Sequence, residues 1–415
     1  MDDSPGTRGS LATLGRAGLA VTAATAAANL LAYLPPVLAA RRLAPADLGA
    51  LAAALALVAI ATMPGVGLQT AVAVATARSG APVAAARQSW RCALVCGGAL
   101  LPATPVLAAA LSLPVALPPL LAAMTVPAVL AGWPLGLLQG SERFGRLAAG
   151  TVLLALGRYA GVLIGLAAGF GLTGTFALAA AVAWLLPPAL SRLPRTSADR
   201  AADPVPGGAD AAPSVPPGAE LRGRAVFTAA SASLAILVAS YADLILARRL
   251  LPPGESGAYA VGAVLTRAAI WAPQVVTIVA LPRLVRGGPA RRIGLALVAG
   301  VGAVLITGVA VAGHLVVTAV GGTRYAALAH LAPYFVLVGA LYAVTVLLVN
   351  ALLAAGAQRP AAGVWASLAV LVAVVAAVRP ATVAHLLACS VGAAALSVLT
   401  TAALSVRRKP FTSAR

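Results

Sequence analysis

Long apolar runs alternate with short polar intervals along almost the whole chain. A transmembrane helix needs about 20 consecutive apolar residues, and the runs predict about twelve such helices. The chain is therefore predicted to be an all-α polytopic membrane protein. The predicted helices cover residues 17–40, 48–76, 92–112, 115–138, 149–169, 172–190, 224–247, 256–282, 293–319, 325–354, 361–378 and 381–405.

Two short motifs occur once in each half of the chain. Ala-Arg-Arg-Leu stands at residues 40–43 and again at 247–250, about 207 residues later, and each copy is followed by proline and glycine. A glycine-to-arginine motif at 140–143 has a looser echo at 356–359. Repeats of this kind are typical of transporters built from two similar halves around a shared central site. The pattern predicts two six-helix repeats around a central cavity.

A polar interval separates the two predicted repeats. Residues 191–223 are rich in proline, glycine, serine and acidic residues, a composition typical of flexible linkers. The predicted domains are an N-terminal six-helix lobe at 1–190, a cytoplasmic linker at 191–223 and a C-terminal six-helix lobe at 224–415.

Composition supports a membrane protein. The chain is 61% hydrophobic and 9% charged, whereas soluble domains carry about 25% charged residues. A net charge of +19 would favour nucleic-acid binding in a soluble chain. Here the arginines fall almost entirely between apolar runs, so membrane topology explains them and no nucleic-acid partner is expected. The expected partner is the lipid of the membrane.

The distribution of basic residues predicts the orientation. About 21 of the 29 Lys and Arg residues lie on the side of the two termini and the linker. Because cytoplasmic loops carry the excess of basic residues, both termini and the linker are predicted to be cytoplasmic. The expected location is the inner or plasma membrane.

The repeated arginines break this charge rule. Arg41 and Arg248 end the first and seventh predicted helices on the outer side, where the negative end of a helix dipole favours cations. Gly49 and Gly257 follow, and we expect them to let two helices approach closely. This pattern favours a structural hairpin repeated by duplication. An outer gate that touches the substrate is the alternative.

Features of an enzyme are absent from the sequence. The predicted outer loops are short, and paired catalytic carboxylates, Ser-His-Asp arrangements and clustered metal ligands are not found. Cys92, Cys96 and Cys389 lie in apolar runs and are interpreted as small buried side chains. We therefore expect no enzymatic activity, no cofactor and no metal.

Charged residues inside the predicted helices are the strongest candidates for function. Arg267 and Arg158 fall near the middle of their helices, where an arginine costs at least about 2.5–3.5 kcal/mol to insert. Each is a candidate contact for a substrate anion, or else forms an internal ion pair or hydrogen bonds with carbonyls of a broken helix. Asp243 lies closer to a helix end. It either pairs with Arg248 or Arg267 or couples transport to a proton or cation.

Uncharged polar residues and prolines complete the pattern. Pro64 and Pro273 fall at nearly corresponding places in the two halves and predict kinks that bend during transport. Four deep amides are candidates to line the cavity or to bond helix to helix: Asn29, Gln69, Gln274 and Asn350.

Three stretches resemble a known family. Residues 29–51, 137–145 and 241–250, the last running on into Gly257-Ala-Tyr259, are similar to polysaccharide-biosynthesis membrane proteins. These are the lipid-linked oligosaccharide flippases of the multidrug/oligosaccharidyl-lipid/polysaccharide (MOP) exporter superfamily. The resemblance implies two six-helix bundles around a V-shaped central cavity, in which basic residues hold a lipid diphosphate.

That resemblance assigns expected roles to four arginines. Arg267 and Arg158 become candidate diphosphate contacts, and Arg16 and Arg91 would lie near the cytoplasmic mouth of the cavity. The N-terminal lobe has few charges compared with some relatives. This difference argues against cation coupling in that lobe.

The expected function is a flippase that moves a polyprenyl-diphosphate-linked oligosaccharide outward, with other polysaccharide-assembly proteins as candidate partners. One alternative is a multidrug or metabolite antiporter of the same superfamily, although an exporter of organic cations should carry intramembrane acids. A second is a non-transporting scaffold of cell-envelope synthesis, which would not need arginines deep in the membrane. A membrane glycosyltransferase or polymerase is a further alternative. It would need a large outer loop with acidic catalytic residues, which this sequence lacks.

Overall fold

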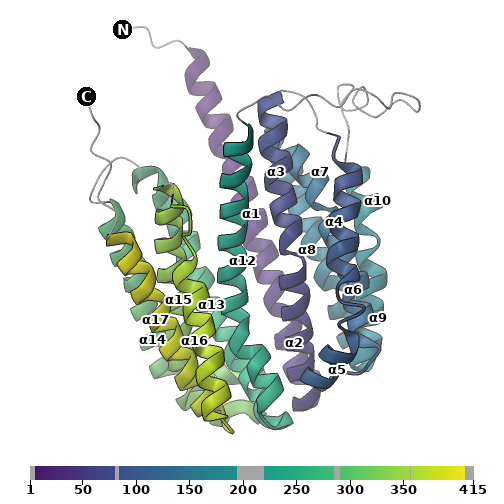
Figure 1. Cartoon of the computed structure of the whole chain (residues 1–415), viewed down its shortest axis with the longest axis vertical. Helices are drawn as coiled ribbons and strands as arrows, with labels where there is room; N and C mark the ends of the chain where they lie inside the picture. Colours follow the sequence, from purple (N-terminus) through teal and green to yellow (C-terminus); the bar gives the residue numbers. More distant parts are fainter. Residues whose placement is uncertain (1–4, 80–83, 194–218, 285–289, 356, 407–415) are drawn as a thin grey trace. The chain divides into compact units, whose positions relative to one another are not determined.

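Helices account for all regular structure in the described residues. The computed structural model describes residues 5–79, 84–193, 219–284, 290–355 and 357–406 (Figure 1). Within them, nine helices or continuous helix pairs are long and apolar enough to cross a membrane, and Ala362–Val378 is a shorter apolar helix. The all-α polytopic membrane fold is therefore confirmed. Most of the predicted linker, residues 194–218, lies outside the described residues.

Several spans of the first half are interrupted. The second predicted helix is divided at Thr62, and the third, fourth and sixth are also divided. The helices are α1 (Pro5–Arg42), α2 (Pro45–Ala61), α3 (Met63–Ser79), α4 (Ala86–Gly98), α5 (Thr104–Leu111), α6 (Leu117–Leu130), α7 (Gly132–Gly140), α8 (Phe144–Ala167), α9 (Gly171–Ala183) and α10 (Leu186–Ser191).

Helices of the second half are mostly continuous. They are α12 (Ala219–Leu250), α13 (Pro253–Leu284), α14 (Ala290–Gly321), the 3₁₀ helix η1 (Thr323–His330), α15 (Ala332–Ala354), α16 (Ala362–Val378) and α17 (Val383–Val406). Helix α13 passes through Pro273 without interruption, so only Pro64 stands at a break. The predicted helix at 325–354 begins instead as η1, because Pro333 favours the first turn of a new α-helix.

Two compact units make up the fold. Unit 1 contains residues 1–35, 57–109 and 113–227, and unit 2 contains 36–56, 110–112 and 228–415. The boundaries differ from those of the two predicted lobes, because the second unit includes segments from the first half of the sequence. Both copies of the repeated hairpin consequently belong to unit 2.

Small residues bring helices together in unit 1. Helix α7 packs along α3 (Figure 1). A Cβ atom on Gly136 would lie 2.6 Å from the Gln69 carbonyl oxygen, and one on Gly132 or Gly140 would collide with the α3 backbone. Side chains at these positions would force the helices apart. Glycine spacing of this kind allows close packing where lipid provides no hydrophobic driving force.

The two repeated hairpins contact each other inside unit 2. A Cβ atom on Gly49 would collide with the Ser256 hydroxyl, and one on Gly257 would collide with the Pro45 carbonyl. The close approach predicted for the two glycines is therefore confirmed. Each glycine faces the partner hairpin, so the contact repeats the symmetry of the sequence motif.

Arginines of the hairpins bind carbonyl groups at helix ends. Arg248 donates from Nε to the Leu111 carbonyl at 2.8 Å and from Nη2 to the Ser112 carbonyl at 2.8 Å, at the end of α5. Arg41 donates from Nη2 to the Ala319 carbonyl at 2.6 Å, in the last turn of α14. Each repeat thus supplies an arginine to the third predicted helix of the other repeat. These contacts support the structural-hairpin interpretation.

Replacement of Gly257 by alanine should destabilise the protein. The new methyl group would collide with the Pro45 backbone, which cannot rotate away as a side chain can. Overpacking of this kind costs about 1–3 kcal/mol. Thermal unfolding of the purified protein in detergent measures the loss.

Gly254 provides the matched control three residues earlier in the same helix. A Cβ atom there meets nothing within 4 Å. Gly254→Ala should therefore leave the unfolding temperature unchanged. Equal unfolding temperatures for the two alanine variants would contradict the close contact between the hairpins.

Candidate functional site

A buried hydrogen-bond network surrounds Asp243 in unit 2. The carboxylate is 4% exposed and accepts a hydrogen bond from the Tyr259 hydroxyl at 2.8 Å. Its other oxygen accepts the Leu244 N–H at 2.8 Å. Tyr259 also lies 3.1 Å from the Ser390 hydroxyl, which donates to the Leu386 carbonyl at 3.0 Å. The network therefore joins α12, α13 and α17.

Sequence reasoning missed Tyr259 as the partner of Asp243. It proposed Arg248 or Arg267, but Arg248 donates to backbone carbonyls instead. The Nε and Nη2 atoms of Arg267 make no hydrogen bond with the carboxylate. Because Tyr259 is 16 positions away and fully buried, only the antiparallel packing of α12 and α13 brings the two side chains together.

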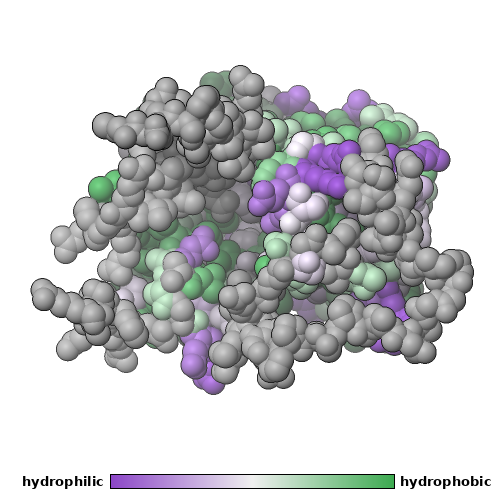
Figure 2. Space-filling view, turned by 90° about the horizontal axis from the view of Figure 1, so that it is seen from above, coloured by the Kyte–Doolittle hydropathy of each residue, from purple (hydrophilic) through white to green (hydrophobic). Residues whose placement is uncertain are grey.

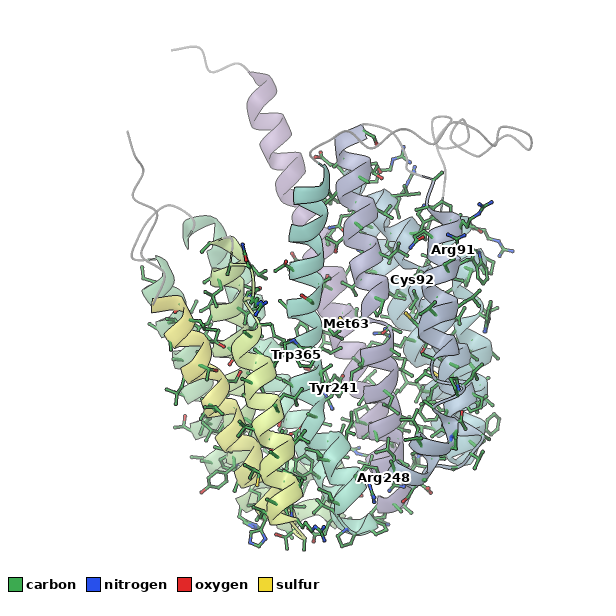
Figure 3. All side chains as sticks on the ribbon, in the orientation of Figure 1. Met63, Arg91, Cys92, Tyr241, Arg248 and Trp365 are labelled. Atoms are coloured by element: carbon green, nitrogen blue, oxygen red, sulfur yellow. The ribbon has the colours of Figure 1, made fainter. Side chains whose placement is uncertain are left out.

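Arg267 on α13 stacks against Tyr241 on α12. Its Cζ atom lies 4.1 Å from the centroid of the Tyr241 ring, within the range of a cation–π interaction. The Nε and Nη2 atoms of Arg267 are buried and have no hydrogen-bond partner in the described structure. Figure 3 labels Tyr241 and Arg248 on α12; Tyr241 lies within the candidate membrane span Ala230–Leu250, and Arg248 lies in the last turn of the helix. Arg267 is therefore held against a candidate membrane span.

Arg158 lies beside a helix break in unit 1. Its Nη2 atom donates to the Thr62 hydroxyl at 2.5 Å, and Thr62 separates α2 from α3. The Thr62 hydroxyl in turn bonds the Ala59 carbonyl at 3.1 Å. The Nε atom of Arg158 is buried without a partner among the described residues. The Nη2 donor of Arg158 thus stabilises the helix break, and the Nε donor is available to bind a ligand.

The predicted amides have different surroundings in the described residues. Gln69 donates from Nε2 to the Gln139 carbonyl oxygen at 3.0 Å and so bonds α3 to α7, as one of its two predicted roles required. Asn29 is half-buried on α1, and Asn350 is exposed on α15. The side chain of Gln274 lies outside the described residues.

Arg91 and Arg16 are the two arginines expected near the cytoplasmic mouth of the cavity. Arg91 is exposed on α4, as is Arg87 one turn earlier. Hydrophilic residues gather at this end of unit 1 when it is viewed from above (Figure 2). The side chain of Arg16 lies outside the described residues.

Metal-binding chemistry finds no support in the described residues. They contain no group of three or more His, Cys, Asp or Glu side chains that could hold a metal ion. The three cysteines are free thiols, and each is half-buried. Among the charged side chains of the described spans, Asp243 is buried, and Arg158 and Arg267 are partly buried.

Comparison with known proteins identifies the fold. No protein-family model and no curated protein matches the chain. Among solved structures, it resembles the crystal structure of the eukaryotic MATE transporter AtDTX14 with a TM-score of 0.51, over 94% of both chains and at 12% sequence identity. The chain therefore has the fold of a MATE transporter. This likeness, together with the apolar helices, agrees with the predicted polytopic all-α membrane fold.

Replacement of Tyr259 by phenylalanine should lower the free energy of unfolding. The substitution removes the hydroxyl that donates to Asp243 and leaves a buried carboxylate oxygen without this partner. The expected cost is about 1–3 kcal/mol, measured by thermal unfolding in detergent.

Tyr334→Phe serves as the control because Tyr334 is 54% exposed. Loss of its hydroxyl leaves no buried carboxylate without a partner, so the unfolding temperature should not change. A stability loss of the same size in both variants would show that Tyr259 has no special role in holding Asp243.

Proposed function

We propose that the protein is a membrane transporter that moves a polyprenyl-diphosphate-linked oligosaccharide from the cytoplasmic to the outer leaflet by alternating access. Arginine side chains would hold the diphosphate, and the lipid tail would remain in the bilayer. The observation that carries the proposal is the pair of buried, unpartnered donors on Arg267.

A buried guanidinium with unpartnered donors is unfavourable unless a ligand completes it. Each unsatisfied buried donor costs roughly 1–3 kcal/mol, and more for a charged group. Phosphate oxygens fit paired guanidinium donors in both charge and geometry. A bound diphosphate would accept hydrogen bonds from Nε and Nη2 of Arg267. It would thereby remove the free-energy cost of leaving these buried donors unsatisfied.

The balance of charges favours an anionic cargo. Arg158 and Arg267 both retain buried donors without partners in the described chain, whereas the Asp243 carboxylate already accepts two hydrogen bonds. An organic cation would need an available acid. The described spans supply available donors instead.

A second candidate is an antiporter of the same superfamily that exports a drug or metabolite. Two observations favour it: the fold neighbour is a MATE transporter, and Asp243 is a buried acid suited to bind a coupling ion. In that case Asp243, together with Tyr259, would bind a proton or cation. The cargo would then need no diphosphate.

Location and partners follow from the charge pattern and from the proposed substrate. The inner or plasma membrane with cytoplasmic termini remains a prediction of the basic-residue distribution. A lipid-linked precursor is made on one side of the membrane and used on the other. Proteins that assemble polysaccharide are therefore the proposed partners.

Arg267→Ala should abolish flipping without preventing membrane insertion. The alanine substitution removes both the charge and the paired donors. Arg267→Lys keeps the charge but loses the paired donors of the guanidinium, so it should restore only part of the activity. The measurement is complementation of a deletion strain, with the amount of lipid-linked precursor on the cytoplasmic leaflet as readout.

Arg87→Ala provides the control, because Arg87 is exposed on α4. It should complement fully at the same protein level. Full activity of Arg267→Ala at normal expression would remove the diphosphate assignment. Loss of precursor synthesis in the deletion strain, instead of accumulation, would point to an enzyme.

Asp243→Asn distinguishes the two transport candidates. If Asp243 binds the coupling ion, the variant should still bind cargo but should no longer respond to an imposed ion gradient in proteoliposomes. If the carboxylate is structural, transport and its gradient response should fall together with stability. Unchanged gradient-driven transport at normal stability excludes Asp243 as the coupling site.

A further inference from the structure

The Arg267 guanidinium lies over the face of the Tyr241 ring. The Arg267 Cζ atom lies 4.1 Å from the ring centroid. A guanidinium is planar, and its N–H groups point outward in that plane. The ring therefore holds the side chain without using any of its hydrogen-bond donors.

The two unpartnered donors lie on one edge of the guanidinium. The covalent structure of arginine directs the Nε–H group and one Nη2–H group to the same side, nearly parallel to each other. These are the two atoms that are buried without a hydrogen-bond partner in the described residues. Two oxygens bound to one phosphorus or carbon atom fit such an edge as a bidentate pair. A single acceptor would leave one donor unsatisfied.

The nearest acid does not occupy this edge. Asp243 accepts its hydrogen bonds from Tyr259 and from the Leu244 N–H. It accepts no hydrogen bond from Nε or Nη2 of Arg267. An acceptor for the Nε/Nη2 edge must therefore come from outside the described part of the chain.

We propose that Tyr241 is a positioning residue, which fixes the plane of Arg267 so that its Nε/Nη2 edge binds two oxygens of one phosphate group side-on. This inference rests on the proposed function, since it takes Arg267 as the contact for the anionic part of the cargo. The ligand class is a phosphate or diphosphate, either attached to a lipid or free. Tyr241 itself does not touch the ligand and acts through Arg267.

Binding of defined probes to the purified full chain tests the proposal. Isothermal titration in detergent compares farnesyl diphosphate, inorganic pyrophosphate and farnesol. Binding of farnesyl diphosphate and pyrophosphate, but not of farnesol, would show that the anionic group is recognised. Binding of farnesyl diphosphate alone would show that the lipid is required as well.

Substitutions of Tyr241 separate the ring from its hydroxyl. Tyr241→Phe keeps the aromatic face and should bind farnesyl diphosphate within about twofold of the unsubstituted protein. Tyr241→Leu removes the face and should weaken binding about tenfold or more, since a desolvated cation–π contact is worth that much. Tyr334→Leu removes an exposed tyrosine and should have no effect.

A double substitution shows whether Tyr241 acts through Arg267. Once Arg267→Ala has weakened binding, adding Tyr241→Leu should cause no further loss, because the group that the ring positions is gone. A merely structural role for Tyr241 would instead weaken binding equally in both backgrounds. Unfolding temperatures of all variants are measured alongside.

The outcomes separate this inference from the proposed function. If Arg267→Ala abolishes binding and Tyr241→Leu does not weaken it, the positioning role is wrong and the anion site stands. Equal losses from Tyr241→Phe and Tyr241→Leu would also overturn the positioning role, since the hydroxyl would then be responsible. If the unsubstituted protein binds no phosphate probe, both proposals fail.

Discussion

The last carbonyl groups of a helix have no partner within the helix and must find one elsewhere. In unit 2 the repeated arginines meet this need. Arg248 binds the end of α5, and Arg41 binds the last turn of α14. Gly49 and Gly257 bring the two hairpins close enough for these contacts to form together. Each copy of the duplicated motif thus supplies an arginine that binds carbonyl groups at a helix end in the other half of the sequence.

The number of donor nitrogens already hydrogen-bonded distinguishes structural arginines from candidate ligand-binding ones. Arg248 uses three nitrogen atoms on carbonyl groups, so it has little left to offer a ligand. Arg158 uses one nitrogen on Thr62 and keeps Nε buried without a partner in the described chain. Arg267 is held by a ring face and keeps two such donors. Arg267 therefore has more buried, unpartnered donors in the described chain than Arg158 or Arg248.

The sequence was sufficient for properties that depend on local pattern. Apolar run length predicted the spans, and the repeated motif predicted the close glycine contact. Side-chain partners were beyond reach because they are distant in sequence: Arg248 and Leu111 are 137 positions apart, and Tyr259 and Ser390 are 131 apart. The break at Thr62 shows an intermediate case. Pro64 marked the region, but only the structure reveals that Arg158 donates to the interrupting residue.

The arrangement of α12 explains how an acid and an arginine coexist nearby without neutralising each other. Tyr241 and Asp243 are two residues apart, so they point to different sides of the helix. Asp243 turns toward Tyr259 on α13, whose hydroxyl donates to it, and its other oxygen accepts the Leu244 N–H of its own helix. Tyr241 instead meets Arg267 with its ring. The carboxylate leaves the Nε/Nη2 edge of Arg267 unoccupied. A direct ion pair would have used that edge, and the arginine would then have had no donors to offer an anion.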